Sequence, residues 1–137
     1  VEAGIVGGNL SVVYSQLGSP SQIKAQGRVL LLEDLDEYLY HIDRMFWGLK
    51  RAGVFEGVKG LILGGFTALK DNTTEHGQDL NNPWGKDLNE IVAEAVGSDV
   101  PIAFDVNVGH LADNRAIVFN KDATINFSPE SLKIKYA

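Results

Sequence analysis

The chain has 137 residues, with 12 basic and 18 acidic side chains that leave a net charge of −6, and it contains no cysteine. This length fits a single domain, which we take to span residues 1–137. The acidic balance argues against binding to nucleic acid or to an anionic membrane face, and the lack of cysteine excludes disulfides and thiolate chemistry. No apolar run approaches the roughly 20 residues that span a bilayer.

The first half of the chain reads as strands that alternate with helices. Asn9 is a suitable cap for a short helix that ends near Gly18. The apolar run at residues 28–33 predicts a strand that is buried on both faces. A helix to about Ala52 follows, and Asp34 and Glu37 have the spacing of a capping box at its start. Its apolar stripe consists of Leu39, Ile42, Phe46 and Leu49.

The second half adds further strands and one helix. Residues 58–66 predict another buried strand that stops at the pair Gly64 and Gly65, which reads as a tight turn. A long polar surface loop at residues 70–85 precedes a helix with a capping box at Asp87 and Glu90 and a stop at Gly97. Further strands are predicted at residues 101–106, 116–119, 123–127 and 132–136. The order predicts an α/β fold, a small mixed sheet with helices packed on it.

The three histidines differ in their setting. His110 follows a glycine just beyond the strand predicted at residues 101–106, where a loop histidine is well placed for proton transfer. A purely structural role for it stays open. His41 reads as a partly exposed helix residue, and His76 as a solvated residue of the polar loop.

Glu33 stands at the end of an apolar strand, where a carboxylate can reach a cleft and orient an imidazole. Alternatively it is a charge that the dipole of the following helix favours. Ser11 and Ser15 lie on the first helix, which is a poor place for a strained nucleophile. A glutamate and a histidine supply a base and its orienter but no nucleophile, and spacing alone does not pair them.

Several segments, in this order, resemble the C-terminal domain of the LD-carboxypeptidases (muramoyl-tetrapeptide carboxypeptidases), a family that includes the microcin C immunity peptidases. They are residues 7–11 (Gly-Gly-Asn-Leu-Ser), 31–34 (Leu-Leu-Glu-Asp), 40–45, 60–66, and Gly109-His110 with Asn114. One departure is residues 117–120, where the family tends to have a Leu-Pro-Leu-Gly-like turn.

The resemblance implies a curled, barrel-like sheet and a serine peptidase without a metal or other cofactor. It implies that Glu33 and His110 are the catalytic glutamate and histidine, and that an N-terminal domain supplies the serine. Because residue 1 is Val and the only Met is Met45, we expect this chain to be one piece of such a protein. The implied activity removes terminal D-alanine from cytoplasmic muropeptides during cell-wall recycling, and the implied assembly is a homodimer.

Two other functions stay open at this point. One is hydrolysis of peptide-nucleotides of the microcin C type, which would use the same Glu33 and His110. The other is a non-catalytic binding domain that presents the polar loop 70–85 to a protein or glycan. Trp84, Asn81, Asn82 and Asp79 would suit such contacts, although Trp84 can also be a loop anchor packed on the core.

Overall fold

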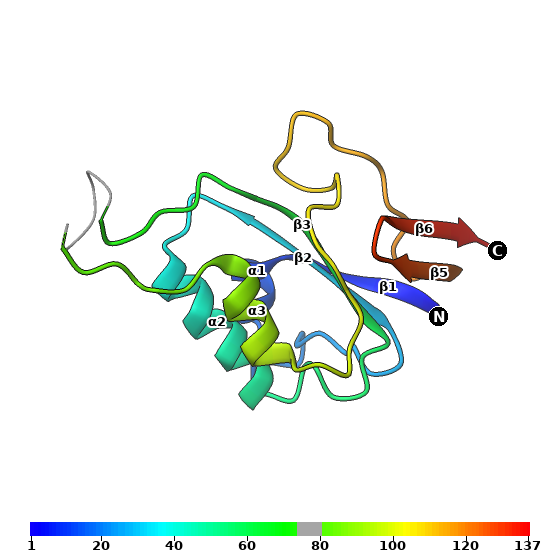
Figure 1. The fold of residues 1–137 in the computed structure, drawn as a ribbon. Coiled ribbons are helices and arrows are strands. Elements are labelled where there is room, and N and C mark those ends of the chain that lie inside the picture. The colour runs from blue at the N-terminus through cyan, green and yellow to red at the C-terminus, as the bar shows by residue number, and fades with distance from the viewer. Residues whose placement is uncertain (74–80) are drawn as a thin grey trace.

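The computed structural model describes residues 1–73 and 81–137, and these form one mixed sheet with helices on it (Figure 1). The elements in chain order are β1 (Glu2–Asn9), α1 (Leu10–Ser15), β2 (Val29–Leu35), α2 (Leu39–Arg51), β3 (Gly60–Thr67), α3 (Leu88–Val96), β4 (Ile102–Ala103), β5 (Asp122–Ser128) and β6 (Ser131–Tyr136). The strands lie in the order β4-β3-β2-β1-β5-β6. Strands β1 to β4 pair in parallel, whereas β5 pairs antiparallel with both β1 and β6.

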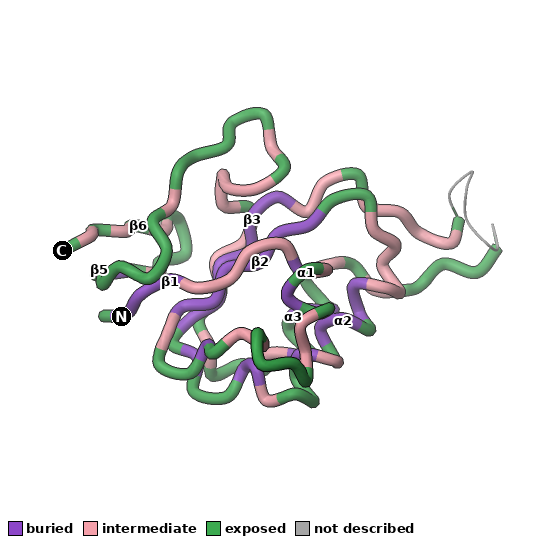
Figure 2. Tube along the Cα trace, turned by 180° about the vertical axis from the view of Figure 1, so that it is seen from behind, coloured by how far each residue is buried: buried purple, intermediate pink, exposed green. Residues whose placement is uncertain are grey.

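One face of the parallel strands carries the helices. Alternate residues of β2, such as Leu30 and Leu32, point into this layer and pack against the buried stripe of α2, which contains Ile42, Phe46 and Leu49. Figure 2 shows the buried positions gathered on the central strands and on the inner sides of the helices. Among the described residues, no helix combines the length and the apolar character that crossing a bilayer requires.

The opposite face of the sheet is covered by the C-terminal strands and by residues of the segment before them, such as Val106, Val108 and Ile117. Val29, Leu31 and Ile62 on this face form a second cluster with residues of β5, including Ile125. Phe127 of β5 reaches across to β3, because a Cβ atom on Gly60 would lie 2.5 Å from its ring. Since β1 and β2 lie between these strands, the sheet must curl over to make this contact, and the predicted curled mixed sheet is confirmed.

The helix caps agree with the sequence at two of three starts. The side chain of Asn9 accepts a hydrogen bond from the backbone of Val12 at the start of α1, and Asp87 and Glu90 form a capping box at α3. The capping box predicted at Asp34 is wrong, because α2 begins after Tyr38, which makes no side-chain cap. Asp34 lies inside β2, and its carboxylate is taken by donors from α1.

Two strand predictions differ from the structure. The strand predicted at residues 101–106 is paired only at Ile102–Ala103, and residues 116–119 form no strand. Single hydrogen bonds hold this last segment and its flanks to different partners. The amide of Val118 donates to the Tyr136 hydroxyl, and that of Asn120 donates to the carbonyl of Ile5. This apolar run therefore stays largely exposed and joins no ladder, with Val118 and Phe119 both on the surface.

Candidate active site

Glu33 and His110 lie in direct contact where the parallel strands end. Oε2 of Glu33 is 2.6 Å from Nδ1 of the His110 ring, and the backbone amide of His110 donates to the same oxygen at 3.3 Å. The Glu33 side chain is 10% exposed and the His110 side chain 47% exposed. The carboxylate is thus held inside while the imidazole faces outward.

The direction of the Glu33 side chain follows from the pleat of β2. Leu31 points to the face opposite the helices, and two residues on Glu33 points to the same face. The register with β3 slips at this position, where Leu32 pairs with Leu63 but Asp34 pairs with Phe66. Two residues of β3, Gly64 and Gly65, therefore stand opposite Glu33 in a β-bulge. The glycine pair that reads as a terminal turn lies inside β3 instead.

Glycines make room for the buried carboxylate. A Cβ atom on Gly109, which has φ +97°, would lie 2.7 Å from both Cγ and Oε2 of Glu33. A Cβ atom on Gly64 would lie 3.1 Å from the Cβ of Glu33 and 2.4 Å from the carbonyl oxygen of Val108. A side chain at either position would displace the glutamate or the loop before His110. Gly64 and Gly109 therefore belong to the site. Sequence reasoning did not identify them as site residues, because a glycine in the sequence does not show which side chain will pack against it.

The loop that carries His110 is docked on the bulged part of β3. The amide of Gly65 donates to the carbonyl of Val108 at 2.8 Å, and Gly65 and Gly109 form a parallel bridge. The Thr67 hydroxyl donates to the carbonyl of His110 at 3.1 Å. The side chain of Asn114 accepts from the amide of Gly109 at 3.0 Å. The imidazole therefore projects from a backbone that is fixed on both sides.

A polar brace closes the outer part of this loop. The Asp113 carboxylate accepts hydrogen bonds from the Arg115 guanidinium at 3.0 Å and from the Asn107 side chain. The Arg115 guanidinium, and then the Asn107 amide, lower the pKa of Asp113 below its usual value. The same contact with Asp113 raises the pKa of Arg115. Both groups stay charged at neutral pH, and the ends of the loop stay tied.

A second polar cluster lies behind Glu33, on the helix face of the sheet. Asp34 is 3% exposed, and its carboxylate accepts hydrogen bonds from the backbone and the hydroxyl of Ser11, the Asn9 side chain and the Leu35 amide. Asp34 therefore ties the end of β2 to the end of β1 and to the start of α1. The backbone of Glu33 next to it is held by this anchor.

His41 is a surface counterpart of His110. Its Nδ1 lies 2.6 Å from Oε2 of Glu37, and the side chain is 37% exposed, as the helix position predicted. Ser11 donates to the carboxylates of Asp34 and Glu37, and Ser15 donates to a carbonyl of its own helix. Within residues 1–73 and 81–137, no serine or threonine hydroxyl bonds to the His110 ring, so these residues provide no nucleophile there.

The polar loop is described only in part. His76 and Asp79 lie outside the described residues, whereas Asn81 and Asn82 lie at exposed positions. The Trp84 indole donates to Oδ2 of Asp43 at 3.2 Å, so this tryptophan is anchored by a polar contact. Sequence reasoning missed Asp43, a buried acid in the middle of α2. Its position next to the apolar stripe of this helix could have indicated it.

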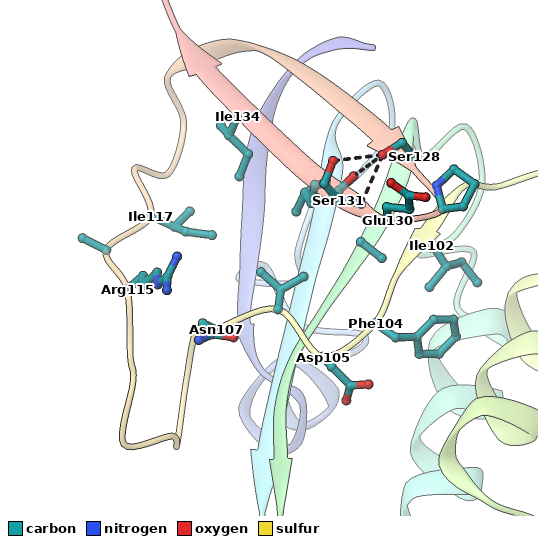
Figure 3. A pocket seen from close by; sticks show the side chains of 15 residues that line it. Ile102, Phe104, Asp105, Asn107, Arg115, Ile117, Ser128, Glu130, Ser131 and Ile134 are labelled. Carbon is teal, nitrogen blue, oxygen red and sulfur yellow. Dashed lines mark hydrogen bonds between the residues drawn. The ribbon is translucent and has the colours of Figure 1, made fainter.

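No metal site is evident around these groups. Across the described part of the chain, no three His, Cys, Asp or Glu side chains gather closely enough to hold an ion. A cavity of about 760 Å³ lies between residues 102–107, residues 115–117 and the β5–β6 hairpin (Figure 3). Neither Glu33 nor His110 lines it, although Asn107 and Arg115 belong to the braced loop.

Comparison with known proteins identifies the family of this chain. Residues 2–125 match the LD-carboxypeptidase C-terminal domain family. A Rickettsia conorii protein that carries a carboxypeptidase name is 33% identical over 95% of this chain and 37% of its own length. The murein tetrapeptide carboxypeptidase of Pseudomonas aeruginosa is 29% identical over 91% of this chain and 38% of its own length.

The fold is also found among solved structures. The muramoyltetrapeptide carboxypeptidase from Oxalobacter formigenes superposes with a TM-score of 0.80 at 24% identity, over 100% of this chain and 47% of that one. The chain thus spans less than half the length of each of these proteins. With the family match extending over most of its residues, this chain belongs to the LD-carboxypeptidase C-terminal domain family.

Proposed function

We propose that this chain is the part of a serine carboxypeptidase that supplies Glu33 and His110 to a Ser-His-Glu triad. The substrate is a muropeptide, and the bond cleaved joins an L-centre to a terminal D-alanine. The reaction belongs to cytoplasmic cell-wall recycling. The names of the relatives support the substrate class, and the serine comes from a preceding domain of the longer protein.

One observation carries the proposal, namely the contact of 2.6 Å between Nδ1 of His110 and the buried carboxylate of Glu33. An ionised carboxylate only accepts hydrogen bonds, so the proton of a neutral ring sits on Nδ1. The other ring nitrogen, Nε2, is then an unprotonated base on a half-exposed side chain. A triad requires this tautomer of its histidine.

The proton steps follow from that geometry. Nε2 of His110 takes the hydroxyl proton of the serine as its oxygen attacks the carbonyl carbon of the L,D bond. The imidazolium, stabilised by Glu33, gives this proton to the nitrogen of the departing D-alanine, and an acyl-enzyme remains. Nε2 then takes a proton from the water that attacks the ester carbon, and it gives this proton to the departing serine oxygen, which restores the serine and the neutral ring.

Part of the machinery must come from outside this chain. In this scheme the preceding domain supplies the nucleophile and the hydrogen-bond donors that stabilise the oxyanion. Each such donor lowers the activation free energy by about 3 kcal/mol. The isolated 137-residue chain is therefore expected to release no D-alanine from a muropeptide. Measurable release by the purified chain would contradict the proposed division of labour.

The test is D-alanine release by the full-length protein. Glu33→Gln removes the orienting charge with little change of shape and is expected to lower kcat about 10⁴-fold, while His110→Ala removes the base with a loss of similar size. His41→Ala is the matched control, since His41 pairs with a glutamate at the same distance of 2.6 Å. Turnover within about tenfold of wild type for both site variants would remove the assignment.

A second substrate separates the two members of the peptidase class. The same full-length protein is assayed with a peptide-nucleotide of the microcin C type. Cleavage of the muropeptide with little cleavage of the peptide-nucleotide is the expected result. The opposite preference keeps Glu33 and His110 in their roles but overturns the proposed substrate.

A further inference from the structure

An aromatic cluster lies just beyond the ends of β2 and β3. The rings of Tyr38 and Tyr40 stack with centroids 5.1 Å apart, and Trp84 meets Tyr40 edge-on at 6.3 Å. Trp84 is 38% exposed, so its ring is open to solvent rather than buried in the core. Exposed aromatic rings that hold one another in place form a ready platform for a ligand.

The orientation of the Trp84 ring is locked by two acids. Its indole nitrogen donates to Oδ2 of Asp43 at 3.2 Å, and its backbone amide donates to Asp71 at 2.8 Å. Asp43 is only 6% exposed and projects from α2. Burying a carboxylate costs free energy of folding, so a contact whose only effect is to hold an exposed indole would not be expected from stability alone. The contact keeps the tryptophan face in a fixed position.

A cavity of about 390 Å³ opens beside this ring and is lined by Tyr40, Arg44, Asn72 and Trp84. The Arg44 guanidinium lies 4.9 Å from the centre of the Tyr40 ring. The side chain of Asn72 adds a polar group to the lining. The cavity thus combines flat aromatic surface, one cation and a polar amide side chain.

The charges around the platform restrict the ligand further. Lys70 lies 5.3 Å from the centre of the Tyr38 ring, and its bond to Asp36 raises the pKa of Lys70 above its usual value. Two cations thus already occupy tyrosine faces of the cluster, which disfavours a cationic ligand.

A saccharide satisfies these conditions. Its hydroxyl and acetamido groups form hydrogen bonds with polar side chains such as those of Asn72 and Arg44, and its C–H faces pack on the negative faces of aromatic rings. We propose that the cavity beside Trp84 binds a saccharide, with Trp84 and Tyr40 as the packing surfaces and Asn72 as the polar contact. Resting on the proposed function, the site takes the sugar portion of the muropeptide.

The position of the cavity fits this use. Glu33 and Tyr38 are joined by the end of β2, and five extended residues span at most about 17 Å. Thr67, which holds the His110 backbone, lies three residues before Lys70, and Lys70 is bridged to Tyr38. Two short stretches of chain therefore run from the Glu33–His110 pair to the platform. A disaccharide joined to a peptide is long enough to occupy the cavity beside Trp84 and the Glu33–His110 site at the same time.

Tryptophan fluorescence tests binding directly. The sequence has two tryptophans, so Trp47→Phe leaves Trp84 as the single reporter. Titration of this variant with N,N′-diacetylchitobiose is expected to change the emission saturably. Adding Tyr40→Ala is expected to weaken binding and so to raise the dissociation constant about tenfold. No saturable change up to high millimolar disaccharide, or tighter binding of AMP than of the disaccharide, would overturn the proposal.

A matched pair of variants excludes a non-specific effect. Trp47 is 39% exposed and its ring also carries a cation, Lys50, at 4.6 Å. In NMR titrations with the same disaccharide, Trp47→Ala is expected to retain the shift changes and Trp84→Ala to lose them. Equal behaviour of the two variants would contradict a defined site. A folded spectrum of Trp84→Ala confirms that the loss is local.

The role in catalysis has a separate readout. In the full-length protein, Trp84→Ala is expected to raise KM about tenfold for the disaccharide-peptide without changing its kcat. The kcat and KM for the sugar-free peptide are expected to stay the same. If disaccharide binding fails while Glu33→Gln inactivates the enzyme, only the saccharide site is lost. If the disaccharide binds but Glu33→Gln has no effect on turnover, only the proposed reaction is lost.

Discussion

Nδ1 of His110 lies 2.6 Å from Oε2 of Glu33, although 77 residues separate the two along the chain. The contact buries the carboxylate and leaves the imidazole half-exposed. A hydrogen bond between a carboxylate and one ring nitrogen decides which tautomer the ring adopts. The chemistry proposed for this chain depends on that choice, so it is the first point to measure.

The tautomer of His110 is observable in the isolated chain. In ¹⁵N NMR spectra of the neutral ring, His110 is expected to show a protonated Nδ1 and an unprotonated Nε2. Glu33→Gln replaces an obligate acceptor with an amide and is expected to remove this bias. The His41 ring, which contacts Glu37 instead, serves as the control and should not respond. A wild-type spectrum with the proton on Nε2 would contradict the proposed base.

Gly109→Ala tests the close approach to the glutamate. The added Cβ would lie 2.7 Å from Oε2 of Glu33, in addition to the cost of about 1–2 kcal/mol for a left-handed backbone. Gly97 is a matched control, because it has φ +87° with nothing within 4 Å of an added Cβ. We expect chemical denaturation to show a larger loss for Gly109→Ala than for Gly97→Ala. Equal losses would mean that the glutamate contact is not tight.

Asp34→Ala tests the anchor behind the site. The change leaves Ser11 and Asn9 donors without their acceptor in a place that is 3% exposed, and the free energy of unfolding should fall by about 3 kcal/mol. Asp99→Ala, at an exposed turn, should change it by less than about 0.5 kcal/mol. A fall for Asp34→Ala as small as the Asp99→Ala change would show that the anchor contributes little.

The brace at Asp113 predicts a pH dependence. Its pKa is lowered in the folded chain by Arg115 and Asn107, so its stabilising contribution is present above the unfolded value of about 3.9 and is lost as pH falls through the lower folded value. The carboxyl ¹³C signal of Asp113 should therefore titrate below this value. Arg115→Gln should raise the midpoint, and Arg51→Gln on α2 should not. Identical midpoints in all three proteins would contradict the brace.

Two of the three helix caps predicted from neighbours in sequence agree with the structure. Asn9 caps α1, and Asp87 and Glu90 cap α3, because a cap involves residues only three or four positions apart. Asp34 and Glu37 have the same spacing and form no cap. The carboxylate of Asp34 accepts hydrogen bonds from Ser11 and Asn9, which lie in a different part of the chain. Capping rules consider only residues close in sequence, so they do not predict that these donors take the carboxylate instead.

The site divides in a similar way. Glu33 and His110 are recognisable one by one, as an acid that ends a buried strand and a histidine after a glycine, but their pairing rested on the family resemblance. The bulge at Gly64 and Gly65 was read as a turn, because a glycine pair has the same appearance in both settings. Only the neighbouring strand shows which setting applies.

The alternation of strands and helices in the first half of the chain, the helix starts at Asn9 and Asp87, and the choice of Glu33 and His110 as candidates could be read from the sequence itself. Each of these depends on local periodicity or on contacts within one helical turn. The tertiary structure decided the curl that brings Phe127 over Gly60, the burial of Asp34 and the meeting of Glu33 with His110. Those features depend on contacts between segments far apart along the chain, whose geometry exists only once the sheet has formed.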